Sequence, residues 1–311
     1  MRLGSGNEAV VFGPFTRHDL SGMGIHLPAA NRIDHKYVLK VFKDRFEKLP
    51  PIKAPRGSII FPIETLTWDG ARLGTYLQWK DARPDKLYTI EVQEYGGYDM
   101  YDFLVDRYTY FTSTDFGHVW KSVIAIFEDV YPLIGIENKL LLDIKTENMV
   151  WDGRRLRLID LHLGGQETQV FTPSIMNMPI QFLHRYWNKK RNIDVHFKDV
   201  SKKYYESPQN PYFHLLHELH HQVSSLQELI PLFDKQTLLS PKEIKRLKFF
   251  FVVYPIFMTV LIMFELKKIR LDSHARQIHR IRDFCFQTIY DRGSHLMPFR
   301  AFIDKCKQLS F

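Results

Sequence analysis

Cysteine is scarce in this sequence: among 311 residues there are two, Cys285 and Cys306. Two thiols supply neither a disulfide framework nor a cysteine-based metal knuckle, so both are excluded as the basis of the fold. We therefore expect a reducing, intracellular compartment, the cytoplasm or the nucleus. The chain begins MRLGSGNEAVVF, without the basic and apolar regions of a secretory signal.

A hydrophobic run of membrane-spanning length is also missing. The uncharged stretch FFFVVYPIFMTVLIMF covers only residues 249–264 and contains Pro255, whereas a membrane-spanning helix needs ~20 apolar residues. Basic residues flank the stretch on both sides, so they give no inside–outside asymmetry. We expect a buried helix, or two short helices broken at the proline, and no membrane partner.

Charge of one sign does not gather into a long block. Lys and Arg together number 43 against 35 Asp and Glu, a net charge of +8. This excess favours acidic partners such as nucleotide phosphates. Because the basic residues are scattered, the sequence has no strong nucleic-acid signal. With 45% hydrophobic residues, the chain can build one large domain or two lobes.

The strand and helix patterns divide the chain into two parts. VVFGPF and KYVLKVF read as strands, and LGTYLQW and LYTIEVQEY predict a hairpin whose turn holds Pro84-Asp85. Helical periodicity begins with YDMYDFLVDRY and HVWKSVIAIFEDVYPLI, after Gly96-Gly97. We therefore predict an α+β fold with a small β-rich unit, residues 1–97, and a larger helical unit, residues 98–311. The expected ligand site is a cleft between them.

Two features near the N-terminus suit phosphate binding. Gly4-Ser5-Gly6 forms a glycine turn between strand-like runs, where the backbone N–H groups can approach a phosphate closely. The alternative is an ordinary hairpin turn. Lys40 is a lone cation in the apolar strand YVLKV. Strand alternation could leave it on a solvent face, or it could point towards phosphate oxygens.

A third feature is LLLDIKTENMVWDGRRLRLIDLHLGG at residues 140–165, where acidic residues interrupt apolar runs. Asp143 could accept the proton of a substrate hydroxyl. Asn148 and Asp160 carry the hard oxygen donors that Mg²⁺ prefers, and Lys145 could neutralise charge on a transferred phosphoryl group. The Asp152-Gly153 pair predicts a hairpin turn.

The order of these features resembles the eukaryotic-type protein kinase family across nearly the whole chain. LDIKTEN is similar to the catalytic loop, IDLHLG to the metal-binding DFG segment, KYVLKV to the strand with the ATP-binding lysine, and GSGNEAVV to the glycine-rich loop. EVQEYGGYDMYDFL resembles the hinge and the following helix. The resemblance implies a bilobal kinase fold, with a small β-rich N-lobe and a larger helical C-lobe, and the cofactors ATP and Mg²⁺.

The resemblance also implies a role for each site residue. Asp143 would be the catalytic base, Lys145 would contact the γ-phosphate, Lys40 would pair with the other phosphates, and Asn148 and Asp160 would hold Mg²⁺. The residues expected around the nucleotide are Gly4, Ser5, Gly6 and Ala9 over the phosphates, Val11 and Val38 on the adenine, Gln93 as gatekeeper, Glu94 and Gly96 through their backbone, and Asp99 at the ribose.

The family also uses a helix glutamate to hold the lysine. Glu64 fits the family's distance to the hinge and is the preferred candidate, in a short or distorted helix after Pro62. Glu47 is the alternative, seven residues after Lys40.

Departures from the family pattern leave three functions open. Leu141-Leu142 replaces His-Arg before the catalytic Asp, and Leu161-His162 replaces the Phe-Gly of DFG. We expect a serine/threonine protein kinase acting on protein substrates without an activation-loop phosphorylation switch. The alternatives are a pseudokinase or ATP-binding scaffold, and a kinase-like small-molecule phosphotransferase. The trimmed N-lobe resembles that of virus-encoded kinases, which would place the protein in an infected host cell.

Overall fold

The computed structural model describes residues 1–5, 9–28, 35–43, 57–106, 108–133, 144–159, 241–290 and 297–311. The chain divides into two compact units. We call residues 1–56 and 60–96 the sheet unit, and residues 57–59 and 97–311 the helical unit. The mixed α+β class agrees with the prediction, and the chain passes from one unit to the other between Gly96 and Gly97. The kinase-like two-lobed fold stays a prediction.

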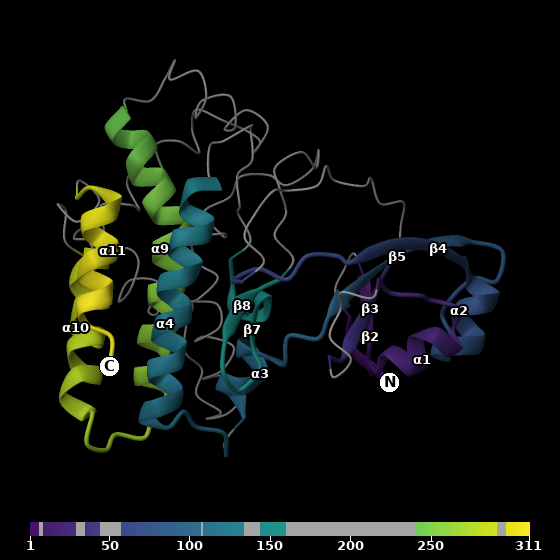
Figure 1. The fold of residues 1–311 in the computed structure, drawn as a ribbon, viewed down its shortest axis with the longest axis horizontal. Coiled ribbons are helices and arrows are strands. Elements are labelled where there is room, and N and C mark those ends of the chain that lie inside the picture. The colour runs from purple at the N-terminus through teal and green to yellow at the C-terminus, as the bar shows by residue number, and fades with distance from the viewer. Residues whose placement is uncertain are drawn as a thin grey trace, which may run out of the picture. The chain divides into compact units, whose positions relative to one another are not determined.

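The sheet unit contains a five-stranded sheet in the order β1-β2-β3-β5-β4, with every neighbouring pair antiparallel (Figure 1). Its elements are β1 (Arg2–Ser5), β2 (Ala9–Phe15), α1 (Arg17–Gly22), β3 (Tyr37–Phe42), β4 (Glu64–Asp69), α2 (Gly70–Leu77) and β5 (Leu87–Glu94). The predicted strands in VVFGPF, KYVLKVF and LYTIEVQEY are confirmed. β-Branched and aromatic residues favour this pleated, largely buried surface.

One face of this sheet packs on α1 and α2. Alternate residues of the strands, among them Leu39, Val41, Ile90 and Val92, form a hydrophobic core with Leu20 of α1 and with residues of α2. The Arg72 side chain of α2 lies beside this core: its guanidinium carbon is 4.3 Å from the Trp68 ring centroid, and its Nη2 donates to the carbonyl of Met23, the C-cap of α1, at 2.6 Å. The two helices are thereby tied to the same face.

The predicted LGTYLQW strand is wrong, because residues 70–77 form helix α2. Asp69 caps this helix: its Oδ1 accepts a hydrogen bond from the N–H of Arg72 at 2.7 Å. Leu73 and Leu77 occupy one face at a spacing of four residues and enter the core. The capping aspartate and the i, i+4 leucines outweigh the strand propensity of a short aromatic run.

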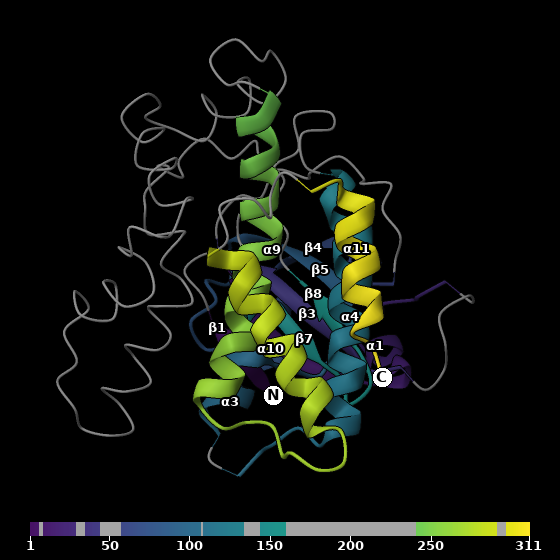
Figure 2. The ribbon, with the colours of Figure 1, turned by 90° about the vertical axis from the view of Figure 1, so that its left-hand side faces the viewer.

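The helical unit contains a small antiparallel sheet and a group of long helices (Figures 1 and 2). Its elements are β6 (Tyr98–Asp99), α3 (Met100–Val105), α4 (Ser113–Val130), the 3₁₀ turns η1 (Tyr131–Leu133) and η2 (Thr146–Asn148), β7 (Met149–Trp151), β8 (Leu156–Leu158), α9 (Pro241–Glu265), α10 (Ala275–Tyr290) and α11 (Phe299–Gln308). The predicted Asp152-Gly153 turn joins β7 to β8 and is confirmed.

Helices α4, α9, α10 and α11 run alongside one another and bury the core of this unit (Figure 2). Thr112 and Asp115 form a capping box that fixes the start of α4. Trp120 of α4 is fully buried, stacks on Phe257 of α9 at 5.9 Å between ring centroids, and donates from Nε1 to the carbonyl of Cys306 at 3.0 Å. Aromatic packing and one buried hydrogen bond thus join three helices.

The apolar stretch at residues 249–264 lies in α9, a continuous helix with Pro255 inside it. The prediction of a buried helix is confirmed, but the proline does not break it. The Thr259 hydroxyl donates to the carbonyl of Pro255 at 2.8 Å, and Val252, Val253 and Phe257 are fully buried. Among the helices that the structure describes, none combines the length and apolarity needed to cross a bilayer.

We expect the two glycines of α2 to respond in opposite ways to alanine. A Cβ on Gly70 would lie 1.9 Å from the carbonyl oxygen of Arg83, whereas a Cβ on Gly74 meets nothing within 4 Å. Gly70→Ala should therefore lower the free energy of unfolding by about 2 kcal/mol or more. Gly74→Ala should raise it by about 0.5–1 kcal/mol through helix propensity. Urea unfolding followed by tryptophan fluorescence measures both, and equal effects would contradict this helix assignment.

Candidate functional site

Lys40 lies on the face of the sheet opposite to the α1–α2 core. Leu39 and Val41, which flank Lys40 in β3, belong to that core. Because successive side chains of a strand point to opposite faces, the Lys40 side chain points to the other face of the sheet. Lys40 is 8% exposed. The interpretation of Lys40 as an ordinary solvent-facing strand lysine is therefore wrong.

Strand register brings the residues expected at the nucleotide together around Lys40. Val11 is its register partner on β2, and Gly4 of β1 is in turn the partner of Val11. We call this surface the Lys40 face. It carries Ala9, Val11, Val38, Lys40, Phe42, Glu91 and Gln93. Five of these, Ala9, Val11, Val38, Lys40 and Gln93, are residues that the sequence placed beside ATP.

Glu64 does not have the environment that the sequence predicted. It begins strand β4, so the expected helix at this position is wrong. Its register partner is Val92, a core residue, and opposed residues of an antiparallel pair share a face. Glu64 therefore lies on the side of the sheet opposite to Lys40. The alternative, Glu47, lies outside the described residues.

Glu91 is a residue that sequence reasoning missed. It is the register partner of Lys40 on β5, and it is 8% exposed. Its Oε2 accepts a hydrogen bond from Nε2 of Gln93, the expected gatekeeper, at 3.0 Å. The signal was present in the strand LYTIEVQE, where Glu91 and Gln93 alternate with the core residues Ile90 and Val92. A buried carboxylate and amide on a single strand face indicate a polar site.

The remaining residues of the sheet unit lie at strand ends. Gly4 and Ser5 are in β1 and pair with β2, and Gly6 lies outside the described residues, so the glycine turn stays a prediction. Glu94 ends β5, and its Oε1 lies 3.3 Å from Nδ1 of His35. Gly96 follows the strand as the last residue of this unit.

Asp99 has a structural task in the helical unit. It is the N-cap of α3, and its Oδ1 accepts from the N–H of Asp102 at 2.7 Å. Burial raises the pKa of Asp99 from 3.8 to about 6, and the carboxylates of Asp102 and Glu147 act in the same direction. The hydrogen bond from the Asp102 backbone opposes this rise. The side chain is thus a desolvated acid as well as a helix cap.

Lys145 and Asn148 are placed by the η2 turn before β7. The N–H of Asn148 donates to the carbonyl of Lys145 at 3.0 Å. The carbonyl of Asn148 accepts from the N–H of Ile159 at 2.9 Å, which closes the β7–β8 hairpin behind it. Asn148 is 6% exposed. The η2 turn and this hydrogen bond therefore hold Asn148 next to Ile159, the residue that precedes Asp160 in the sequence.

The predicted base Asp143 and the predicted metal ligand Asp160 also lie outside the described part of the chain. Each is the direct neighbour in sequence of a described residue, Ile144 and Ile159 respectively, and Ile144 is buried. Within the described ranges, no group of three or more His, Cys, Asp or Glu residues could hold a metal ion. A magnesium site made from Asn148 and one carboxylate would contain only one residue of these four types, so it would not form such a group.

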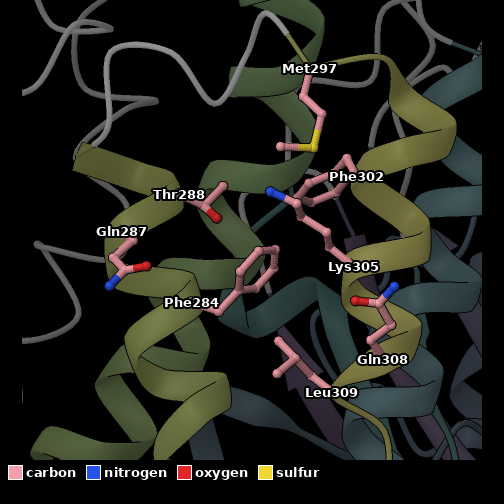
Figure 3. A pocket seen from close by; sticks show the side chains of 8 residues that line it. All are labelled: Phe284, Gln287, Thr288, Met297, Phe302, Lys305, Gln308 and Leu309. Atoms are coloured by element: carbon pink, nitrogen blue, oxygen red, sulfur yellow. The ribbon is translucent and has the colours of Figure 1, made fainter.

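A separate cavity of about 320 Å³ lies between α10 and α11 (Figure 3). Phe284, Phe302 and Leu309 give it apolar walls, and the Lys305 side chain reaches across it from α11. No carboxylate or imidazole is among its lining residues. None of the predicted site residues is among its described lining residues.

Comparison with known proteins does not assign the chain to a family. No family model matches it, and no curated protein matches its sequence. The motifs of the chain and the positions of their residues therefore carry the functional inference.

We expect Asp99→Asn to stabilise the protein in a pH-dependent way. Because the pKa of this acid is higher in the folded chain than in the unfolded chain, its ionisation costs stability as pH rises from about 4 to 6. Asparagine keeps the cap and removes the charge. The variant and the parent should have nearly equal Tm values at pH 4, and the variant should gain about 1 kcal/mol at pH 8, after allowance for solvent screening.

Asp99→Ala is the control for this prediction, because it removes the charge and the cap together. It should be less stable than Asp99→Asn at every pH by about 1 kcal/mol. An advantage of the parent over Asp99→Asn that grows with pH would show instead that the ionised carboxylate is stabilised in the folded chain.

Proposed function

We propose that this chain is a kinase-like enzyme that transfers the γ-phosphate of Mg-ATP to a serine or threonine hydroxyl of a protein. The Lys40 face carries the argument. Motif spacing selected Ala9, Val11, Val38, Lys40 and Gln93 for the nucleotide, and strand register gathers these residues on one side of one sheet. Residues chosen at random from these strands would lie on both faces of the sheet, because successive side chains of a strand point to opposite faces.

Buried charge is the second support from the sheet unit. A lysine that is 8% exposed loses most of its hydration, and a protein retains such a group where it is compensated or used. Apolar Val11 and Val38 beside it suit an adenine ring, and the ammonium suits phosphate oxygens. This combination favours a nucleotide over a purely apolar ligand.

The η2 turn supports the metal part of the proposal. Asn148 and Ile159 are joined by a backbone hydrogen bond of 2.9 Å, and Asp160 follows Ile159 directly in the chain. An amide oxygen and a carboxylate oxygen are hard donors suited to Mg²⁺, which binds one or two protein ligands and completes its shell with phosphates and water. When bound, the ion would neutralise charge on the phosphates.

The chemistry would come from positioning and electrostatics. Asp143 would orient the acceptor hydroxyl and accept its proton, and Lys145 would neutralise charge on the phosphoryl group in transit. Lys40 would hold the phosphates that stay with the nucleotide. Without the arginine before Asp143, no activation-loop phosphate would be needed to order the site.

We expect Lys40→Met and Asp143→Asn each to lower phosphate transfer from labelled ATP by at least 100-fold, to a generic protein substrate or to the protein itself. The first removes the phosphate partner, and the second removes the base without a change in shape. The measurement is label incorporation with Mg²⁺ present. Lys121→Met and Asp85→Asn, both at exposed positions, are the matched controls and should retain transfer.

The outcomes of this assay separate the three functions. Transfer to protein that is lost in both variants supports the kinase. ATP binding without transfer would overturn the kinase in favour of a pseudokinase or ATP-binding scaffold. Transfer to a metabolite and to no protein would instead establish a small-molecule phosphotransferase.

Asn148→Ala should raise the Mg²⁺ concentration for half-maximal transfer by roughly 10-fold or more, because one oxygen donor is lost. High Mg²⁺ should restore most of the rate. A magnesium titration of the transfer rate at saturating ATP checks this. A lower maximum rate at an unchanged midpoint would show that Asn148 acts on the fold of the η2 turn and not on the metal.

A further inference from the structure

We propose that Glu91 of β5 is a carboxylate that positions the Lys40 side chain. The two residues are register partners on neighbouring antiparallel strands. Side chains that oppose each other in this way start with their Cβ atoms about 4.5–5.5 Å apart and lie on the same face. Lys40 and Glu91 therefore share one environment by the geometry of the sheet itself.

Both residues are buried in the sheet unit. Each is 8% exposed, so water screens the attraction between ammonium and carboxylate much less than at a surface. The Nζ of Lys40 also lies 5.0 Å from the centroid of the Phe42 ring on the same face. A ring on one side and a carboxylate on the opposed strand together limit the directions that the lysine can take.

Gln93 orients the carboxylate in turn. Its Nε2 donates to Oε2 of Glu91 at 3.0 Å, and Gln93 is 6% exposed. This hydrogen bond restrains the rotamer of the Glu91 side chain. It does not oppose ionisation of the carboxyl group, because the amide N–H donates to the charged carboxylate. The Lys40 face thus contains a buried set of three polar side chains in which one orients the next.

The rival carboxylate in the sheet, Glu64, faces the opposite side with Val92. Its Oε2 is buried and accepts no hydrogen bond in the described part of the chain. Glu64 therefore belongs to a different environment, and it cannot reach Lys40 without passing through the sheet. In the kinase family a glutamate on a helix holds the lysine. The geometry points to Glu91, on strand β5, as the residue that takes this role here.

The coupling between Lys40 and Glu91 is testable without any enzyme assay, by a double-mutant cycle on Tm with Lys40→Met and Glu91→Gln. Each single variant removes one charge of the pair and leaves the other buried, and the double variant removes both. We expect the sum of the two single shifts in Tm to exceed the shift of the double variant by about 3 °C or more. Additive shifts would overturn the proposal. Should a single variant fail to fold, recovery of folding in the Lys40→Met, Glu91→Met double variant supports it, and failure of that double variant as well contradicts it.

Two further cycles calibrate the result. Lys40→Met with Glu64→Gln should be additive, and coupling there that exceeds the Glu91 coupling would contradict the proposal. Lys307 and Glu128 form an exposed pair with Nζ and Oε1 2.6 Å apart, so Lys307→Met with Glu128→Gln measures a touching but solvated ion pair. Its coupling should be below about 1 °C, because surface pairs contribute little.

The positioning role rests on the proposed function and has its own readout. Glu91→Gln should weaken Mg-ATP binding, measured by calorimetry, about tenfold when Lys40 is present, and by less than twofold in a Lys40→Met background. An equal loss in both backgrounds would show that Glu91 only supports the fold. Coupling in Tm without ATP binding by the parent protein would reject the proposed function and leave the Lys40–Glu91 pair in place.

Discussion

The two-residue alternation of β3, locked in register with β2 and β5, is the constraint on which the functional argument depends. It sends Leu39 and Val41 into the α1–α2 core and Lys40 to the other face. A shift of register by one residue would exchange the two sets and place an ammonium in the core. The apolar core therefore fixes the position of Lys40 indirectly, and with it the positions of every residue on the Lys40 face.

A comparable constraint acts in the helical unit, but it is made by hydrogen bonds. The β7–β8 hairpin turns at Asp152-Gly153, and its open end is closed by the bond from the N–H of Ile159 to the carbonyl of Asn148. Residues that are distant in sequence are thus neighbours in the fold. In the sheet unit a strand pair carries the polar groups, and in the helical unit the η2 turn that carries Asn148 is joined to a strand pair, which suits chemistry that depends on position.

Sequence patterns correctly predicted the strands β2, β3 and β5 and the turn between β7 and β8, because these have local causes, whereas the predicted hairpin of LGTYLQW with LYTIEVQEY was wrong. β-Branched runs and an Asp-Gly turn determine such elements within a few residues. Helix α2 and the position of Glu64 were missed because both depend on context: Asp69 acts as a cap only once β4 ends there, and the face of Glu64 follows from its pairing with Val92. Glu91 was overlooked because a family motif directed attention to helices, while the register that opposes it to Lys40 is a tertiary property.

The polar residues of the Lys40 face run against the demands of folding alone. Apolar residues in place of Lys40, Glu91 and Gln93 would preserve the alternation of β3 and β5, and two charges would no longer lose their hydration on folding. Such replacements of buried charges often leave the stability of a protein unchanged or improve it. Asp99 repeats the pattern, since an asparagine would cap α3 without a carboxylate whose pKa is raised by burial. A fold keeps such groups against its own stability where they serve another purpose. Stability accounts for the cap and the core, whereas the buried charges fit the ligand site that we propose.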